Sequence, residues 1–356
     1  MEKLRETLEG LNQSHLLDII EDSSETHPVI AQLNKLNIEE TLKNYKVAQD
    51  TIASPIPENE IKPVKPLIWK DVSSNEKETI RTIGLDAICS GSVGAIILSG
   101  GQGTRLGFNG PKGMYNLDLP SQRSIFHIHI DRLNAVRKLA ASTGNNTELP
   151  SIPVYIMTSE INSEIIKNYF KENNFFGYPG DDVFFFEQSL EPCVDFNGKI
   201  IMDTKTSLSL APDGNGGIYK ALRKSGAVDD MQRRGVKNLH VYGIDNILTK
   251  SADPAFLGAC IRDKIEVGNK VCWRADKSEK VGVSVDHKGK MLILEYSEIS
   301  RTLADATDDS GKLVYGAGNI CNHYISVDFL TEKVFPSLNH IYHLAKKKIP
   351  YIDLNT

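Results

Sequence analysis

The sequence of 356 residues has no long apolar run and no excess of positive charge. No stretch of about 18 apolar residues is present to span a bilayer, and the N-terminus, Met1 to Glu6, lacks the apolar core of a secretory signal. A net charge of -5 argues against a surface that coats a polyanion, because nonspecific nucleic-acid binding rests on clustered lysine and arginine. We therefore expect a cytoplasmic, globular protein that binds neither membranes nor nucleic acids.

Cysteine is scarce, and the 5 thiols lie far apart along the chain, without a C-x-x-C pair. Zinc sites and redox motifs bring cysteines together at such short spacings. We therefore expect buried, reduced thiols. Apolar residues, in contrast, make up 40% of the sequence, which is enough to fill a substantial core.

The N-terminal part of the chain predicts helices. Apolar residues recur there at roughly helical spacing, as at Ile30 and Leu33. A proline-bearing stretch over 54–66 then interrupts regular structure, because proline removes a hydrogen-bond donor and restrains its predecessor. We therefore expect an N-terminal helical segment with its linker over 1–66, followed by one large domain over 67–356.

Strand, glycine turn and helix alternate in the rest of the chain. The apolar runs that predict buried strands are 94–98, 154–157, 183–186, 239–242 and 291–294. Helical periodicity separates some of them, as over 124–139 and 163–172. This alternation predicts an α/β fold, in which an open, Rossmann-like and mostly parallel sheet carries helices on both faces and binds ligands at the carboxyl ends of its strands.

A glycine-rich loop, LSGGQGTRLG from Leu98 to Gly107, follows the first of these strands. Glycines after a buried strand let backbone N–H groups approach a phosphate closely. The loop is neither a Walker A loop, since no Gly-Lys-Ser or Gly-Lys-Thr ends it, nor a dinucleotide fingerprint. Two cations, Arg105 and Lys112, stand where a polyphosphate would bind. The loop alone favours phosphate binding over an ordinary glycine turn with surface cations.

The strings GGQGTRLG and PKGMY resemble the signature of eukaryotic UDP-N-acetylglucosamine pyrophosphorylases, within the wider family of uridylyltransferases. Further strings match that family in the same order: MTS at 157–159, FEQ at 186–188, APDGNGGIY at 211–219, VYGIDNIL at 241–248, EYSEI at 295–299 and AGNI at 317–320. The N-terminal helices are similar as well. The resemblance implies a fold like that of type A nucleotidyltransferases.

The resemblance also assigns roles to residues. Arg105 and Lys112 are implied to be catalytic, by stabilising charge on the α-phosphate and on the leaving pyrophosphate. Asp245, just after an apolar strand, is implied to hold Mg²⁺, with Mn²⁺ as an alternative, while Glu295 and Asn319 are implied to bind the sugar. The residues implied to bind the nucleotide are Gly100, Gly101, Gln102, Gly103, Thr104, Gln188, Gly214 and Asn215.

Without the resemblance, these residues have ordinary structural interpretations. Gly214 and Asn215 lie in PDGNGG, a composition that is typical of turns. Asp245 suits a helix cap, Glu295 an exposed strand position, and Asn319 a turn in a glycine-rich loop. Their functional interpretation therefore depends on the ordered motifs.

Two histidines, His127 and His129, alternate with apolar residues and suggest a metal site at first sight. Both fall within a predicted helix, where residues two positions apart point away from one another. We therefore do not expect them to share a metal ion.

The implied reaction joins UTP to N-acetylglucosamine 1-phosphate, forms UDP-N-acetylglucosamine and releases pyrophosphate. A sugar phosphate oxygen attacks the α-phosphorus of UTP opposite the pyrophosphate, so no protein nucleophile is required. The alternative substrates are the 1-phosphates of N-acetylgalactosamine, glucose and galactose. A P-loop nucleotidase is disfavoured because the Lys-Ser/Thr pair is missing. The sequence does not indicate an oligomeric state.

The family continues beyond the position of Thr356, through the last part of its sugar-binding domain into a smaller C-terminal segment. The resemblance therefore implies that the 67–356 domain is truncated at its C-terminal end. A truncated form that binds uridine nucleotide without turnover is the corresponding alternative.

Overall fold

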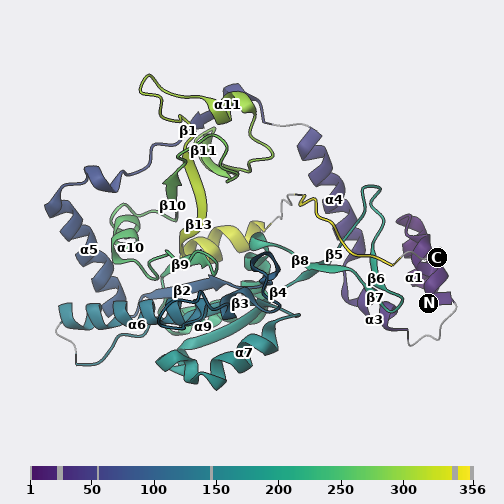
Figure 1. Cartoon of the computed structure of the whole chain (residues 1–356), viewed down its shortest axis with the longest axis horizontal. Coiled ribbons are helices and arrows are strands. Elements are labelled where there is room, and N and C mark those ends of the chain that lie inside the picture. Colours follow the sequence, from purple (N-terminus) through teal and green to yellow (C-terminus); the bar gives the residue numbers. More distant parts are fainter. Residues whose placement is uncertain (1, 22–26, 54–55, 145–146, 339–343, 353–356) are drawn as a thin grey trace. The chain divides into compact units, whose positions relative to one another are not determined.

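The computed structural model describes residues 2–21, 27–53, 56–144, 147–338 and 344–352 (Figure 1). They fall into two compact units. The larger one, here the core unit, comprises Ile56–Gln188 and Gly217–Leu338, and the smaller one, the minor unit, comprises Met1–Pro55, Ser189–Gly216 and Asn339–Thr356. The division into domains at residue 66 stays a prediction, because compactness alone does not define a folding domain.

A mixed sheet forms the centre of the core unit, with the strand order β1-β11-β13-β9-β2-β3-β4, and with β10 paired to β13 and β12 to β11. Its strands are β1 Ile61–Pro63, β2 Val93–Leu98, β3 Val154–Ser159, β4 Val183–Gln188, β9 Asn238–Gly243, β10 Val267–Trp273, β11 Val283–His287, β12 Lys290–Leu294 and β13 Ala317–Ser326. The strands β9, β2, β3 and β4 are parallel neighbours, and β13 runs antiparallel to β9. The predicted α/β class with a parallel centre is confirmed.

The strand predicted over 291–294 does not join the parallel part of the sheet. The apolar run 291–294 forms β12, but in an antiparallel hairpin with β11. The register pairs His287 with Lys290 and leaves Lys288 and Gly289 as a two-residue turn. Both turn residues have positive φ, 54° and 81°, which is the type I′ geometry that two-residue hairpins prefer.

Helices cover both faces of the parallel strands (Figure 1). Along β2, Ala95 and Ile97 face one group of helices, and Ile96 and Leu98 face the other. The first group is α5 Ser74–Cys89, α6 Ile125–Thr143, α7 Ser163–Glu172 and α10 Pro254–Arg262, and the second is α8 Ile218–Ser225, α9 Ala227–Arg233 and α12 Val327–Phe329. Burial on both faces explains why these strands are continuous apolar runs in the sequence. The short helix α11 is Arg301–Asp305.

The minor unit joins the N-terminal helices to a later part of the chain. Its helices are α1 Glu2–Gly10, α2 Leu17–Glu21, α3 Pro28–Lys35 and α4 Ile38–Ala53, and its short strands are β5 Leu190–Pro192, β6 Met202–Thr204, β7 Ser207–Leu208 and β8 Leu210–Pro212. Leu33 packs in one apolar cluster with Met202 and Leu208. The buried Gln13 donates to Gly198 O (2.9 Å) and accepts from Ile200 N (2.9 Å). The predicted N-terminal helices are present, and their apolar face packs on these strands.

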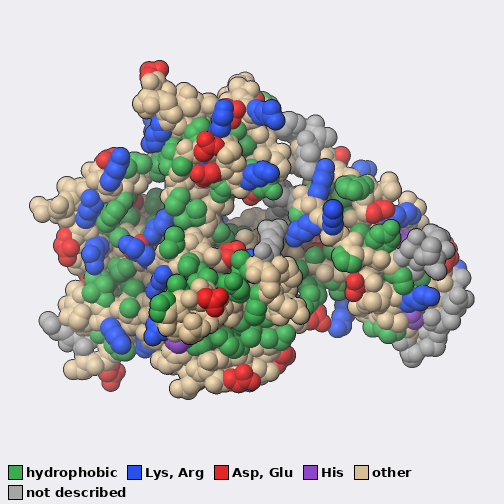
Figure 2. Space-filling model, viewed as in Figure 1, with side chains coloured by type: hydrophobic (Ala, Val, Ile, Leu, Met, Phe, Trp, Pro, Cys, Tyr) green, Lys and Arg blue, Asp and Glu red, His purple; other side chains and the backbone are tan. Residues whose placement is uncertain are grey.

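Charged side chains of both signs are interspersed over the visible face of the core unit (Figure 2). Among the helices that the structure describes, none combines the length and the apolar character needed to cross a membrane.

Candidate active site

The carboxyl ends of β2, β3, β4 and β9 meet at one edge of the sheet. From β2 the chain continues to β3 and β4 on one side, whereas β9 lies on the other side of β2. Ligands of open α/β sheets bind at such a reversal of strand order. The glycine loop follows β2, Gln188 ends β4, and Asp245 follows β9. The structure thus places these predicted site residues at the expected edge.

The glycine loop folds back on itself before α6 begins. Gln102 and Pro111 form a β-bridge, Gly103 N donates to Gly110 O at 2.8 Å, and Lys112 N donates to Gly101 O at 3.2 Å. This fold places the Lys112 ammonium 4.0 Å from the position of a Cβ on the exposed Gly101. The Gly101 backbone and the lysine are therefore open to the same ligand.

Lys112 and Asp245 are in direct contact. Lys112 Nζ donates to Asp245 Oδ2 at 3.0 Å, with the side chains 25% and 59% exposed. A Cβ on Gly243 would lie 3.0 Å from Asp245 Oδ1, so the glycine keeps room for the carboxylate. Lys112, the implied catalytic cation, and Asp245, the implied metal ligand, therefore lie together at the carboxyl ends of the parallel strands, at the switch point where the strand order reverses.

Arg105 and Thr104 begin the short 3₁₀ helix Thr104–Leu106. Thr104 is exposed, while the side chain of Arg105 lies outside the described residues. The catalytic role of Arg105 therefore stays a prediction.

Gln188 packs its amide against the glycine loop. Its side chain is buried, and a Cβ on Gly100 would lie 2.2 Å from Gln188 Nε2. No larger residue fits at position 100 while Gln188 keeps this position. Gln188 Oε1 is buried and has no hydrogen-bond partner among the described residues. A buried polar atom without a hydrogen bond is energetically unfavourable, so a bound group that hydrogen-bonds this amide would be stabilised. The edge of a nucleotide base provides donors and acceptors that an amide can match.

The turn after β3 holds the glycine loop through side chains that the sequence analysis did not assign. Asn162 is fully buried, and its Nδ2 donates to Ser99 O (3.3 Å) and Gly100 O (3.1 Å). Its Oδ1 accepts from Ser159 N at 2.8 Å, and Ser159 Oγ donates to Gly100 O at 3.1 Å. Asn162 occupies the N-cap position of α7, yet its side chain makes no capping bond. The Asn162 side chain therefore supports the glycine loop and does not cap α7.

The loop that carries Asp245 is held by α6. His129 Nε2 lies 3.1 Å from Ile244 O, and Arg132 donates to Thr249 O at 3.0 Å and to Ile247 O. Burial lowers the pKa of His129 to about 4. The ring is therefore neutral at physiological pH and donates one N–H to the Ile244 carbonyl.

The two implied sugar-binding residues meet at Gly282. Asn319 N donates to Gly282 O at 2.8 Å, and a Cβ on Gly282 would lie 3.3 Å from the Glu295 carboxylate. Asn319 Oδ1 accepts from the backbone N–H of Cys321 (3.2 Å), which has a positive φ of 53°. Sequence reasoning missed Gly282, because only the pairing of distant segments shows what a side chain there would meet.

Gly214 and Asn215 belong to the minor unit. Gly214 has a φ of 84°, and Asn215 begins the 3₁₀ helix Asn215–Gly217. The turn suggested by their composition is present. Their role in binding the nucleotide stays a prediction.

The core unit defines a class of protein. An open α/β sheet, a glycine loop after a central strand and a Lys–Asp pair at the switch point are features of an α/β nucleotide-binding protein. A family model described as UTP–glucose-1-phosphate uridylyltransferase matches residues 30–353. The chain belongs to this uridylyltransferase family.

The relatives place the chain more closely within the family. A probable UDP-N-acetylglucosamine pyrophosphorylase of Schizosaccharomyces pombe is 39% identical, over 99% of this chain and 75% of that protein. The UDP-N-acetylglucosamine diphosphorylase 2 of Arabidopsis thaliana is 42% identical, over 84% of this chain and 60% of that protein. The crystal structure of the Trypanosoma brucei uridine diphosphate N-acetylglucosamine pyrophosphorylase has a TM-score of 0.84 and 29% identity, over 99% of this chain and 71% of that chain. The chain thus belongs with the UDP-N-acetylglucosamine pyrophosphorylases and spans about 60 to 75% of these relatives.

Proposed function

We propose that the chain is a uridylyltransferase that forms UDP-N-acetylglucosamine and pyrophosphate from UTP and N-acetylglucosamine 1-phosphate. The Lys112–Asp245 pair beside Gly101 carries this proposal, because it puts a mobile cation and an accessible carboxylate at the switch point of a uridylyltransferase sheet. The names of the relatives support the choice of substrates. The proposal includes a cytoplasmic location.

In this reaction the chain aligns its substrates and balances charge. An oxygen of the sugar phosphate attacks the α-phosphorus of UTP, and the bond to the bridging oxygen of pyrophosphate breaks. Lys112 stabilises the charge that develops on the α-phosphate and on the leaving group, and Arg105 is assigned the same role. The glycine loop positions the phosphates, because Asn162 and Ser159 fix the Gly100 carbonyl.

Binding of the uracil and the sugar completes the alignment. Gln188 presents a buried amide with an unpartnered oxygen among the described residues, which suits the donor and acceptor pattern of uracil. We assign the sugar hydroxyls to Glu295, whose carboxylate accepts hydrogen bonds, and we assign Asn319 to binding of the N-acetylhexosamine. Gly214 and Asn215 are assigned to the nucleotide on the family resemblance alone.

Mg²⁺, or Mn²⁺ in its place, fits the residues at this edge. The described residues contain no cluster of three or more His, Cys, Asp or Glu side chains that would hold a metal alone. A single exposed carboxylate, Asp245, suits magnesium, which keeps several waters and binds through one or two carboxylates together with substrate phosphates. When bound, the ion would neutralise phosphate charge.

An assay of pyrophosphate release tests the proposal. We expect release that requires UTP, N-acetylglucosamine 1-phosphate and Mg²⁺ together. UDP-N-acetylglucosamine should also raise the Tm of the chain. A raised Tm without pyrophosphate release would show a binding protein without turnover, and the absence of both would refute the assigned site.

The description of the family model favours glucose 1-phosphate as the second candidate substrate. A competition assay with the 1-phosphates of N-acetylglucosamine, N-acetylgalactosamine, glucose and galactose separates the candidates. We expect the highest kcat/KM for N-acetylglucosamine 1-phosphate. A higher value for glucose 1-phosphate would keep the reaction type and change the substrate.

A further inference from the structure

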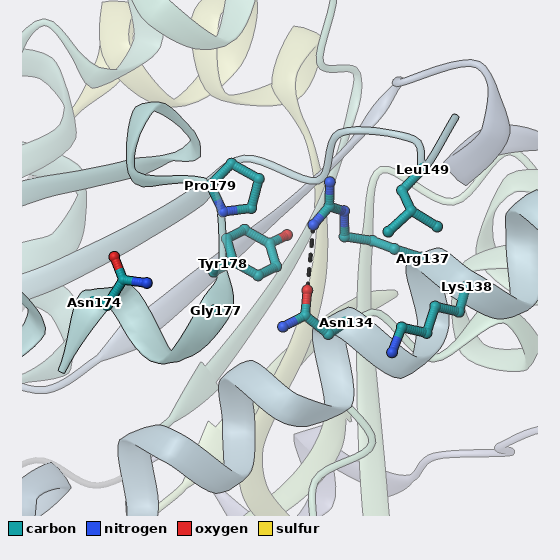
Figure 3. A pocket seen from close by; sticks show the side chains of 8 residues that line it. All are labelled: Asn134, Arg137, Lys138, Leu149, Asn174, Gly177, Tyr178 and Pro179. Atoms are coloured by element: carbon teal, nitrogen blue, oxygen red, sulfur yellow. Dashed lines mark hydrogen bonds between the residues drawn. The ribbon is translucent and has the colours of Figure 1, made fainter. Parts of the chain in front are cut away.

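A hollow of about 440 Å³ opens on the core unit, and Figure 3 shows the side chains that line it. The residues that line it are Asn134, Arg137, Lys138, Leu149, Asn174, Gly177, Tyr178 and Pro179. Several of them come just before β3 or β4, at the amino ends of strands whose carboxyl ends carry the candidate active site. The hollow and the candidate active site therefore lie at opposite ends of the parallel strands.

Arg137 is a buried cation in the lining of the hollow, with only 6% of its surface exposed. Its Nε donates to Pro150 O at 2.7 Å, its Nη1 donates to Asn134 Oδ1 at 3.2 Å, and its guanidinium lies 4.8 Å from the Tyr178 ring centroid. All three partners are neutral, and Arg137 forms no ion pair within the described part of the chain. A buried charge without a counter-charge is unfavourable, so an anion beside Arg137 would be stabilised.

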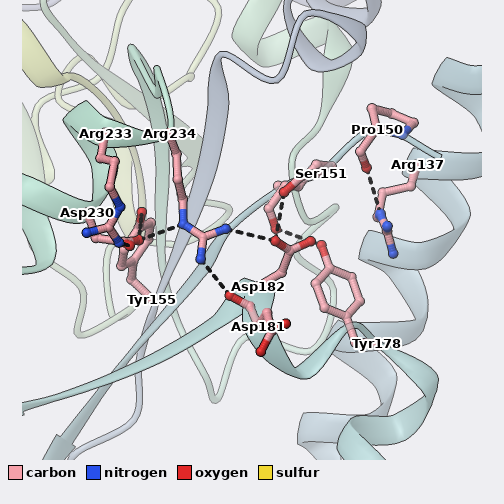
Figure 4. A network of polar contacts seen from close by, with 11 residues as sticks. Arg137, Pro150, Ser151, Tyr155, Tyr178, Asp181, Asp182, Asp230, Arg233 and Arg234 are labelled. Carbon is pink, nitrogen blue, oxygen red and sulfur yellow. Dashed lines mark hydrogen bonds and ion pairs between the residues drawn. The ribbon is translucent and has the colours of Figure 1, made fainter. Parts of the chain in front are cut away.

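Acidic side chains nearby are bound to other arginines (Figure 4). Asp182 accepts from Arg234 and from Ser151 Oγ, each at 2.9 Å. Asp230 accepts from Arg234 Nε at 2.8 Å and also from Arg233. These carboxylates are therefore paired with Arg233 and Arg234 and not with Arg137.

The rest of the lining adds donors and an apolar wall. Lys138 is exposed and makes no ion pair among the residues described, and Asn134 and Asn174 contribute amides. No acidic residue lines the hollow. Leu149 and Pro179 supply apolar surface beside these polar groups.

One wall of the hollow has an unusual backbone. The consecutive residues Asn174, Phe175, Phe176 and Gly177 have φ values of 46°, 50°, 56° and 73°. Left-handed conformation is unfavourable for Phe175 and Phe176, whereas glycine adopts it freely and asparagine tolerates it. Such strain persists only where the surrounding packing imposes it, and it is concentrated at ligand sites.

We propose that the hollow binds a small phosphate monoester. Its dianionic phosphate would lie beside Arg137 and Lys138, which supply the positive charge and the hydrogen-bond donors that phosphate needs. Its carbon part would contact Leu149 and Pro179. The volume of about 440 Å³ is within the range of small-molecule sites. The proposal does not depend on the proposed uridylyl transfer.

Titration calorimetry on the whole chain tests the proposal, with glycerol 2-phosphate as the probe and glycerol as the neutral control. We expect saturable heat with glycerol 2-phosphate only. Arg137→Gln and Lys138→Glu should each weaken binding at least about tenfold. The matched control is Lys171→Glu, which makes the same charge change on an exposed residue of α7 outside the lining, and it should leave the affinity within about twofold.

Three results would overturn the proposal. They are the same affinity in Lys138→Glu as in the unmodified chain, an equal loss in Lys171→Glu, and a loss confined to Lys112→Ala, which would place the anion in the active site. Circular dichroism shows whether Arg137→Gln is folded. Because Lys138 is exposed, its variant carries the test if the arginine variant does not fold.

Discussion

At the scale of single residues, Lys112 and Asp245 contribute little to stability. Their ion pair is partly exposed, and such pairs stabilise folded proteins by about 0–1 kcal/mol. The same exposure leaves both groups open to a bound phosphate. Substitutions at this pair should therefore separate chemistry from folding.

For Lys112→Ala we expect kcat to fall by about 100- to 1000-fold, because a donor to developing negative charge is removed. The Tm should change by no more than about 2–4 °C, the shift that corresponds to about 1 kcal/mol. Steady-state kinetics and calorimetry measure the two effects. Lys171→Ala on α7 is the matched control. An unchanged kcat in Lys112→Ala would show that Lys112 has no part in the mechanism.

Asn162→Ala tests the support of the glycine loop. The loss of two buried donations to the carbonyls of Ser99 and Gly100 should lower the free energy of unfolding by about 1–3 kcal/mol. Because the loop positions the phosphates, KM for UTP should rise more than KM for the sugar phosphate.

The control for this variant is Asn173→Ala at the other end of α7, where an exposed side chain donates to Tyr169 O (2.8 Å). Equal rises of both KM values in Asn162→Ala would leave Asn162 with a purely structural role. Denaturant unfolding gives the stability change independently of the kinetics.

At the scale of elements, the sequence predicted the central strands well and their surroundings less well. Continuous apolar runs identify β2 and β3 because both faces are buried. The position of β12 depends on its partner, which a run of apolar residues does not specify. For the same reason Asn162 and Gly282 had no signal in the sequence, whereas Lys112, Gln188 and Asp245 belonged to motifs that the family resemblance identified.

The packing of α6 and β9 should make stability depend on pH. Burial lowers the pKa of His129 and of His240 to about 4, below the usual value of about 6.5. Well above pH 6.5 these histidines are neutral in both the folded and the unfolded chain, so they contribute no slope. As the pH falls from about 6.5 towards 4, the unfolded chain binds protons that the folded chain does not, and the free energy of unfolding decreases.

Urea unfolding at pH 7 and pH 5 should show a loss of about 2 kcal/mol for each of these histidines. In His129→Gln, where the amide replaces the donor to Ile244 O, this loss should be about 2 kcal/mol smaller than in the unmodified chain. Carboxylates titrate equally in both proteins, so the difference isolates the histidine. Identical losses would contradict a neutral, buried His129.

At the scale of the whole molecule, the minor unit is assembled from segments that are distant in the sequence. The N-terminal helices and the strands within Ser189–Gly216 share one apolar cluster. Helical periodicity predicted the helices from the sequence. It did not predict their partners, because nothing in an amphipathic pattern states which distant segment will cover it.

Leu33→Ala tests this shared cluster. Leu33 is 3% exposed, and its truncation should lower the free energy of unfolding by about 2–5 kcal/mol. Hydrogen exchange should become faster both in α3 and in the hairpin of β6 and β7, while β2 and β3 keep their protection. Unchanged exchange over Met202–Thr204 would show that the hairpin is stable without the helix.

The assembly of the minor unit also sets an order of events on the ribosome. Leu33 is synthesised well before Met202 and Leu208, with which it packs. At about 5–20 residues per second, the apolar face of α3 waits roughly ten to thirty seconds for its partner to emerge. During that interval the apolar face of α3 lacks the strand residues that pack against it in the folded chain, so this face is a binding target for chaperones that act on growing polypeptides.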